Sequence, residues 1–330
     1  MCRNKDVAAL GELLVDFTEA GTSHSGMRLF EQNPGGAPAN VLAALSRWGK
    51  NTAFIGKVGA DMHGDFLCQI LQENNIDTTA LLQDHAVFTT LAFVGLGADG
   101  ERSFSFARKP GADTCLKPEE LCPETFANLK VFHFGSLSLT QEPARSATLR
   151  AIHMAKEAGA WISYDPNYRA ALWPDRETAV RTMRSVLPYV DLMKLSDEET
   201  ELLTGCTAPE QALEKLRAQG VAIACVTLGA EGALVACGQD MRHVAGYRTR
   251  VADTTGAGDC FWGGFLNTLL EKGLGPRAPG MFMPDEVADA ADFGNAAASL
   301  CVEKRGAIPA MPQRDAVEWR RGERSERGML

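Results

Sequence analysis

The sequence has 330 residues and a formal net charge of -9, with 45% hydrophobic and 23% charged residues. This size and composition predict one large globular unit with a hydrophobic core of its own. The acidic balance, without any lysine- or arginine-rich run before the last dozen residues, argues against nucleic acid or an anionic membrane as a partner.

Nine cysteines are scattered along the chain, and none forms a Cys-x-x-Cys pair. An odd number without paired spacing predicts reduced thiols in a cytoplasm and argues against a disulfide framework or a zinc site. The first apolar run, residues 7–17, is interrupted by Glu12 and Asp16. We therefore expect it to be a strand and not the core of a signal peptide.

The N-terminal part predicts a strand, a turn and a helix. Residues 7–10 form the strand, and the alternation that continues to Asp16 is typical of a half-exposed strand that leaves the core. Gly35 and Gly36 then open a helix whose apolar face contains Val41, Leu42, Leu45 and Trp48. This helix start carries the amide side chain of Asn40, although a plain turn before a capped helix would explain the same residues.

Residues 95–100 match the Gly-x-Gly-x-x-Gly pattern of dinucleotide-binding loops, and an expected strand, residues 87–94, precedes them. The residues that follow, 101–106, alternate with period two. Such alternation predicts a second strand and a hairpin turn at Asp99 and Gly100, whereas a dinucleotide site requires a helix there. This argues against an NAD-dependent oxidoreductase, and the sequence contains no P-loop motif either.

From residue 130 onward, expected strands alternate with expected helices, which predicts a parallel sheet covered by helices on both faces. In such sheets, ligands bind at the carboxyl ends of the strands. Polar residues follow three of these strands, in the segments 165–169, 194–199 and 227–232. Each segment alone could merely cap a helix or fill a turn, but their shared position predicts a binding site.

The segment 253–259, Asp-Thr-Thr-Gly-Ala-Gly-Asp, precedes an apolar helical pattern that includes Phe261, Phe265 and Leu269. The helix therefore begins at small residues, where bare amides and the positive end of the helix dipole favour an anion such as a phosphate. Asp259 would then lie beside that anion and could handle the hydroxyl that attacks the phosphorus. Alternatively, the segment is a glycine-rich cap in which Asp259 only complements the dipole.

The C-terminal part predicts one further helix, roughly residues 286–302, which is rich in small side chains. The closing residues have mixed charge and no apolar face. We expect residues 319–330 to be a solvated tail.

Residues 35–40 and 253–259 together resemble the two signatures of the PfkB, or ribokinase-like, carbohydrate kinases, and the resemblance covers about residues 7–312. Within this family, Arg108, the Pro-Gly-Ala-Asp stretch at 110–113 and the segment 165–169 are most similar to fructokinases. Aminoimidazole riboside kinases share the overall pattern.

The resemblance implies a three-layer α/β/α sandwich with a mainly parallel sheet and a small β-sheet lid. Residues 1–318 would form the kinase domain, into which residues 12–34 and 87–109 insert the lid. The lid would close over the sugar and exclude water that could otherwise accept the phosphoryl group. A homodimer would form through the lid if apolar residues on its strands were exposed.

The implied activity is the transfer of the γ-phosphoryl group of ATP, bound with Mg²⁺, to a primary hydroxyl of a sugar, with fructose as the expected acceptor. Asp259 resembles the catalytic base of the family. The family's anion hole, which holds the transferring phosphoryl group, is matched by Gly256, Ala257 and Gly258. The implied sugar contacts are Asp16, Gly35, Gly36, Asn40, Arg108 and Arg169. The implied contacts of the nucleotide and its magnesium ion are Lys194, Glu199, Thr227, Gly229, Gly232, Asn295 and Ser299. A monovalent-cation site for K⁺ would involve Asp253, Thr255, Cys301, Gly306 and Ala310.

Two alternatives remain open on the sequence alone. A related kinase could act on a riboside or on 2-keto-3-deoxygluconate, because these enzymes would differ only in lid and substrate residues. A non-catalytic sugar sensor on the same scaffold would be expected to lose the base or the anion hole, and this chain retains both.

Overall fold

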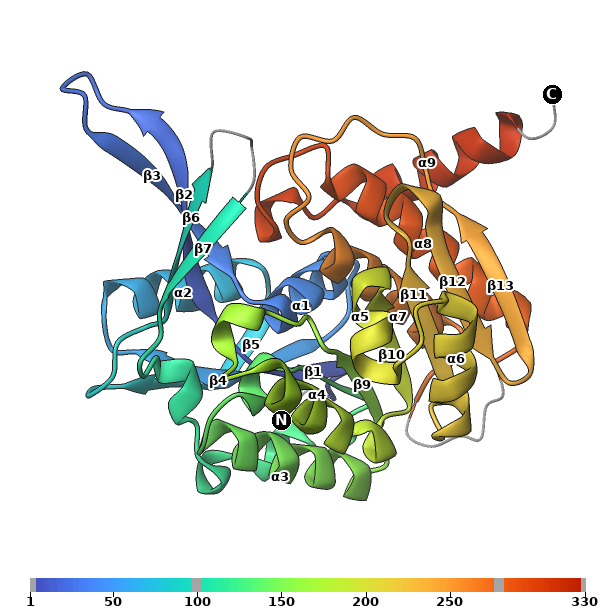
Figure 1. The fold of residues 1–330 in the computed structure, drawn as a ribbon, viewed down its shortest axis with the longest axis horizontal. Coiled ribbons are helices and arrows are strands. Elements are labelled where there is room, and N and C mark those ends of the chain that lie inside the picture. Colours follow the sequence, from blue (N-terminus) through green and yellow to red (C-terminus); the bar gives the residue numbers. More distant parts are fainter. Residues whose placement is uncertain (1–3, 97–101, 276–281, 328–330) are drawn as a thin grey trace.

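The computed structural model describes residues 4–96, 102–275 and 282–327, which fold around a nine-stranded sheet (Figure 1). The strand order is β13-β12-β11-β10-β9-β8-β1-β4-β5. Neighbouring strands from β5 to β11 run parallel, whereas β12 is antiparallel to both β11 and β13. The strands are β1 (Val7–Leu10), β4 (Thr52–Gly59), β5 (Ile76–Asp84), β8 (Val131–Gly135), β9 (Trp161–Asp165), β10 (Leu192–Ser196), β11 (Ile223–Thr227), β12 (Gly232–Cys237) and β13 (Asp240–Ala245).

Helices cover both faces of this sheet, because successive side chains of a strand point to opposite faces and both faces are apolar. In β1, Val7 and Ala9 belong to one core cluster and Ala8 and Leu10 to the other. The first cluster includes residues of α1 (Ala37–Arg47), α2 (Met62–Glu73), α7 (Ala257–Glu271) and α8 (Pro284–Cys301). The second includes residues of α3 (Ala144–Glu157), α4 (Arg176–Ser185), α5 (Asp197–Thr204) and α6 (Pro209–Ala218). The predicted three-layer sandwich is confirmed.

A separate four-stranded sheet projects from the main body, at the upper left of Figure 1, and forms the lid. Its order is β3-β2-β6-β7, in which β2 and β6 are parallel and the two outer pairs are antiparallel. The strands are β2 (Leu14–Thr22), β3 (Arg28–Gly35), β6 (Leu91–Leu96) and β7 (Arg102–Ala107). Strand β7 occupies the place where a dinucleotide site would need a helix. The predicted turn at Asp99 and Gly100 lies outside the described residues.

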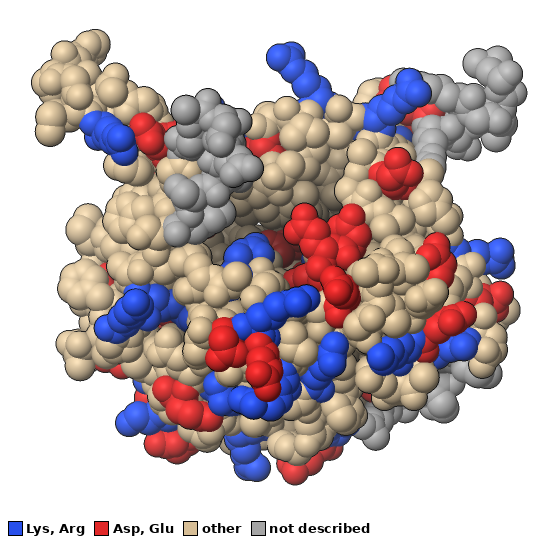
Figure 2. All heavy atoms as spheres, viewed as in Figure 1, with Lys and Arg blue, Asp and Glu red and all other residues tan. Residues whose placement is uncertain are grey.

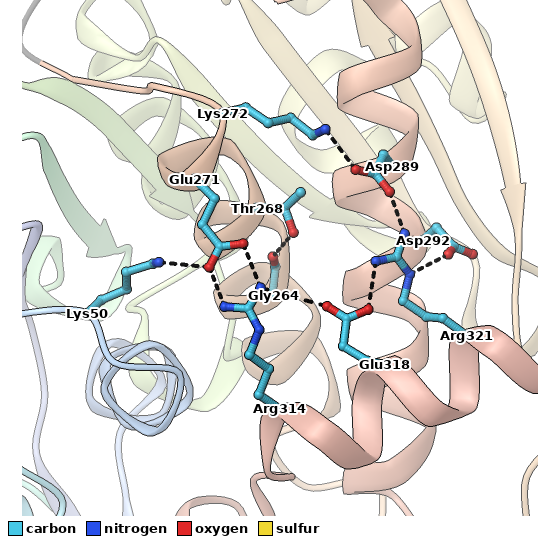
Figure 3. Close-up of polar contacts among 10 residues, drawn as sticks. All are labelled: Lys50, Gly264, Thr268, Glu271, Lys272, Asp289, Asp292, Arg314, Glu318 and Arg321. Carbon is cyan, nitrogen blue, oxygen red and sulfur yellow. Dashed lines mark hydrogen bonds and ion pairs between the residues drawn. The ribbon is translucent and has the colours of Figure 1, made fainter.

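The C-terminal segment differs from the expected solvated tail. Helix α9 (Arg314–Arg327) continues through residues 319–327, and its arginines pair with carboxylates of other helices (Figure 3). Arg321 reaches Asp289 and Asp292 on α8, and Arg314 reaches Glu271 at the end of α7. The sequence does not predict this attachment, because the carboxylates that pair with Arg314 and Arg321 lie on distant helices. Within the described ranges, no helix is long and apolar enough to cross a membrane.

Candidate active site

A cavity of about 720 Å³ lies below the lid, at the carboxyl ends of the central strands. Figure 2 shows it as a hollow between the lid and the body of the protein. Its walls come from the lid strands β2 and β3, the start of α1, the loop after β9, strand β10, the start of α7 and the loop 305–307. Segments from both ends of the chain therefore meet in one site, as the sequence predicts.

The start of α7 forms part of the cavity wall. Gly256 precedes the helix with a φ of 76°, a left-handed conformation that glycine adopts without strain. The amides of Gly258 and Asp259 lie in the first turn, where a helix has no acceptor of its own to offer. Because the helix dipole adds positive potential at the same place, this turn can bind an oxyanion.

Asp259 lies in the first turn of α7 and is only 9% exposed. The Nδ2 of Asn40, in the first turns of α1, donates a hydrogen bond of 2.7 Å to its Oδ2. Burial, assisted by the charge of Asp165, raises the pKa of Asp259 to about 6, although Asn40, Lys194 and Arg169 oppose the rise. Asp259 is therefore a better proton acceptor than an exposed carboxylate and is still ionised at neutral pH.

A buried ion pair lies next to this turn. The Nζ of Lys194 in β10 donates to the Oδ2 of Asp165, the last residue of β9, at 2.7 Å. Burial alone would lower the pKa of Lys194, but the charges of Asp165, Glu199 and Asp259 raise it, so the ammonium stays charged. A Cβ placed on Gly258 would lie 3.1 Å from that Nζ. Lys194 thus adds a positive charge directly beside the predicted anion hole.

The predicted sugar contacts Asp16, Gly35, Gly36 and Asn40 meet at the junction of the lid and α1. A Cβ on Gly35 would lie 2.2 Å from the Oδ2 of Asp16, so only glycine allows this approach. Gly36 has a φ of 120°, which again favours glycine. Burial raises the pKa of Asp16 to about 6, against the opposing charge of Arg169, which also lines the cavity.

Arg108 is placed differently from the other predicted sugar contacts. It is 3% exposed and is not among the residues that line the cavity. Its Nε and Nη2 donate to Asp113, its Nη1 to Thr140, and its Nη2 also to the carbonyl oxygen of Leu137. This arrangement favours a role in anchoring the end of β7 below the cavity.

Glu199 also lies outside the cavity wall. Its Oε1 accepts a hydrogen bond from the backbone N–H of Tyr168 at 2.7 Å, and its Oε2 accepts one from that of Ser196 at 2.9 Å. Both carboxylate oxygens thus accept hydrogen bonds from backbone N–H groups, and these bonds fix the loop after β9 against the start of α5. The predicted role in ordering magnesium through water stays a prediction.

The remaining predicted nucleotide residues lie around the β11–β12 connection and on α8. Thr227 ends β11, and Gly229 and Gly232 form the following turn with φ values of 57° and 101°. Asn295 donates to the carbonyl oxygens of residues 244 and 245, at the end of β13. Ser299 accepts a hydrogen bond from Arg320 of α9. None of these five predicted residues lines the described cavity.

The predicted cation residues lie partly together. The Oδ1 of Asp253 accepts hydrogen bonds from the N–H and hydroxyl of Thr255, and its Oδ2 accepts one from the N–H of Gly306 at 3.0 Å. Cys301 is fully buried beside Cys260, and Ala310 is fully buried in the chain after Gly306. Asp253 therefore holds the loop 305–307 next to the anion turn.

Sequence reasoning did not assign a role to two buried acids of this site. Asp165 was recognisable only as one of several polar residues at a strand end, and its pairing with Lys194 depends on the neighbouring strand. Glu12 follows β1 and reads as an interruption of an apolar run, yet it is 3% exposed and lines the cavity. The pairing of Asp165 with Lys194 cannot be seen without the sheet order, and the burial of Glu12 depends on the start of α1, where the N–H of Ala37 donates to it.

The chain matches the model of the pfkB family of carbohydrate kinases over residues 4–314. It is 42% identical to fructokinase-1 of Oryza sativa subsp. japonica over 314 residues, which cover 94% of this chain and 95% of the relative. A structure of fructokinase with bound ATP from Xylella fastidiosa superposes with a TM-score of 0.90 at 32% identity, covering 97% of this chain and 99% of that one.

A structure of a fructokinase double mutant from Vibrio cholerae, in its fructose-, ADP- and potassium-bound form, has a TM-score of 0.85 at 33% identity. It covers 97% of this chain and 99% of its own. The family match spans nearly the whole chain and includes the glycine-opened starts of α1 and α7 as well as Asp259. The protein therefore belongs to the pfkB family of carbohydrate kinases.

Proposed function

We propose that the protein is a fructokinase, which transfers the γ-phosphoryl group of Mg-ATP to a primary hydroxyl of fructose. The observation that carries this proposal is the placement of Asp259. It lines the cavity of about 720 Å³, accepts a hydrogen bond from Asn40, and lies in the first turn of a helix that a glycine opens. The similarity to plant and bacterial fructokinases supports fructose as the acceptor.

In the proposed reaction, Asp259 accepts the proton of the attacking hydroxyl as the new O–P bond forms. The bond between the γ-phosphorus and the bridging oxygen breaks, and ADP leaves with that oxygen. Negative charge on the transferring oxygens is stabilised by the first-turn amides of α7 and by the ammonium of Lys194. Asp16 and Arg169 would hold the sugar so that the attacking hydroxyl faces Asp259.

The proposal includes a magnesium ion that is held mainly by the phosphates of ATP and by water. Among the described residues, no group of three or more His, Cys, Asp or Glu side chains could hold a metal ion by itself. Mg²⁺ commonly binds through few protein carboxylates together with substrate phosphates, so the residues present fit an ion that enters with ATP. When bound, it would neutralise charge on the phosphates.

On the nucleotide side, we place the ATP phosphates and ribose along Thr227, Gly229 and Gly232, and the adenine near Asn295 and Ser299. Thr227 is the last residue of β11 and is followed by Gly229 and Gly232, while Asn295 of α8 donates to the carbonyl oxygens at the end of β13. For a potassium ion, the supporting feature is the Asp253 turn, which ties residues 253–255 to Gly306. The potassium-bound bacterial relative supports the same choice.

The substrate is tested with an assay of ADP release, using Mg-ATP and a panel of acceptors. The panel contains fructose, other hexoses, ribose, aminoimidazole riboside and 2-keto-3-deoxygluconate. We expect the highest kcat/KM with fructose. Preference for a riboside or a keto-deoxy acid would overturn fructose as the substrate, and no turnover with any acceptor would point to the sensor.

We further propose that the protein works in the cytoplasm as a homodimer that pairs through the lid. Free cysteines throughout the described chain support a reducing compartment. On the lid, Met27, Leu29, Phe30 and Phe93 are 39–67% exposed. Phe93 stacks on Phe17, and the ring of Phe30 packs edge-on against Phe93, so these three residues form an apolar cluster on the lid.

A further inference from the structure

Glu12 lies in the connection between β1 of the main sheet and β2 of the lid, at the base of the cavity. Its Oε1 accepts a hydrogen bond of 3.0 Å from the backbone N–H of Ala37, the first residue of α1. Helix α1 has no acidic residue in its first turn and no capping side chain at Gly36. Glu12 therefore supplies the negative charge that a helix N-terminus favours.

The second carboxylate oxygen of Glu12 has no such partner. Oε2 is buried and has no hydrogen-bond partner among the described residues, although the residue lines the cavity. Arg108 is close enough to influence Glu12 electrostatically, but four of its N–H groups already donate to Asp113, Thr140 and Leu137. A buried carboxylate oxygen without a donor is costly, so its position calls for a ligand that brings one.

The surroundings define the chemistry of that ligand. Asp16, Asn40, Asp259 and Arg169 line the same cavity, and the proposed reaction uses Asp259 for the attacking hydroxyl. A sugar carries further hydroxyls, each of which can donate one hydrogen bond. We propose that the Oε2 of Glu12 accepts a hydrogen bond from a sugar hydroxyl other than the attacking one, while its Oε1 holds the start of α1. This assignment rests on the proposed function and deepens it.

The charge state of Glu12 fits this role. Burial raises its pKa to about 7, while its own backbone N–H, that of Ala37 and the charge of Arg108 lower it and the charge of Asp113 raises it. A hydroxyl that donates to Oε2 would favour the charged form. Sugar binding is therefore expected to be tighter above pH 7, where the carboxylate is already ionised, than below it.

The Glu12→Gln variant separates the two roles. The amide oxygen of glutamine can still accept the Ala37 N–H and preserve the start of α1, whereas its NH₂ group replaces the second acceptor. We expect the KM for fructose to rise about tenfold or more, because a hydrogen bond to a charged group is lost. The KM for ATP and the melting temperature should stay close to those of the wild type. Glu12→Ala should raise the KM for fructose and also lower the melting temperature.

Asp175→Asn is the matched control. Asp175 caps α4, where it accepts a hydrogen bond of 2.7 Å from the N–H of Thr178, and it does not line the cavity. It therefore reports the general effect of an acid-to-amide change at a helix start. We expect its KM for fructose to match the wild type.

Deoxyfructoses that each lack one hydroxyl but retain the phosphorylated one provide the second test. For the analogue without the contacted hydroxyl, the wild type and Glu12→Gln should have the same KM. An equal KM ratio for every analogue, or an unchanged KM for fructose in Glu12→Gln, would show that Glu12 only caps α1. A wild type inactive on fructose would instead refute the proposed substrate, and the same comparison would then be made with the acceptor that the panel identifies.

Discussion

At the residue scale, the chemistry depends on the charges that surround Asp259. Its pKa of about 6 is set by burial and by Asp165 in one direction, and by Asn40, Lys194 and Arg169 in the other. If Asp259 must be ionised to accept a proton, kcat/KM falls as the pH drops below about 6. Asp16, with a raised pKa of its own, should make this fall steeper because it must hold the sugar in the same pH range.

The Asn40→Ala variant tests one of these influences. Removing the 2.7 Å hydrogen bond takes away a group that stabilises the charged carboxylate, so the pKa of Asp259 rises. The acid limb of the kcat/KM profile should then move to higher pH, in addition to any loss of rate. Asn74→Ala, which removes an amide outside the cavity, serves as the control and should leave the limb in place. If kcat/KM of Asn40→Ala still falls only below about pH 6, Asn40 does not influence the pKa of Asp259.

The Asp165→Asn variant should shift the same profile in the opposite direction. The negative charge of Asp165 raises the pKa of Asp259, so its removal lowers that pKa and moves the acid limb to lower pH. Breaking the buried pair also removes the hydrogen-bonded counter-charge of the Lys194 ammonium, at a cost of about 3–5 kcal/mol in unfolding free energy. Denaturant unfolding measures the second effect. If the pH below which kcat/KM falls is unchanged or higher in Asp165→Asn, the predicted fall in the pKa of Asp259 is contradicted.

At the element scale, α9 is attached to the body by the ion pairs shown in Figure 3. The Nε of Arg321 donates to Asp292 at 2.9 Å, its Nη2 contacts Asp289, and Asp289 also pairs with Lys272 at the end of α7. A partly buried arginine with two carboxylate partners is worth more than a single exposed pair.

Replacing Arg321 with alanine should lower the unfolding free energy by about 1–2 kcal/mol and leave kcat unchanged, because the residue lies outside the cavity. Thermal unfolding and steady-state kinetics measure the two effects. Arg242→Ala is the control, since its contact with Asp285 is 3.8 Å long and solvent-exposed, and its effect should stay within about 0.5 kcal/mol. Equal stabilities of the two variants would show that α9 is held by its apolar contacts alone.

The elements differ in how far the sequence could predict them. The starts of α1 and α7 follow from local glycine patterns, and the main strands follow from apolar runs. Helix α9 could not be predicted, because Arg314 and Arg321 find their carboxylates on α7 and α8. Arg108 reads as a sugar contact in sequence, whereas in the fold its guanidinium binds Asp113, Thr140 and the carbonyl oxygen of Leu137 outside the cavity wall. The ion pairs of α9 and the pair of Asp165 with Lys194 were missed because they depend on which distant elements are neighbours.

At the scale of the whole molecule, the lid both covers the cavity and presents an apolar surface. Such a surface is unfavourable in an isolated monomer, and pairing with a second copy would bury it. Phe30→Asp places a charge in this surface and should convert the dimer to a monomer in sedimentation velocity. Trp319→Asp, at an exposed residue of α9, is the control and should remain dimeric. A wild type that sediments as a monomer at every concentration would contradict pairing through the lid.

The most direct test of the proposed mechanism is the turnover of the Asp259→Asn variant. Asparagine preserves the size of the side chain but cannot accept the hydroxyl proton, so kcat should fall by on the order of 10² to 10⁴. The dissociation constants of ATP and fructose, measured by calorimetry, should stay close to those of the wild type. Near-normal turnover in this variant would contradict the role of Asp259 as the base.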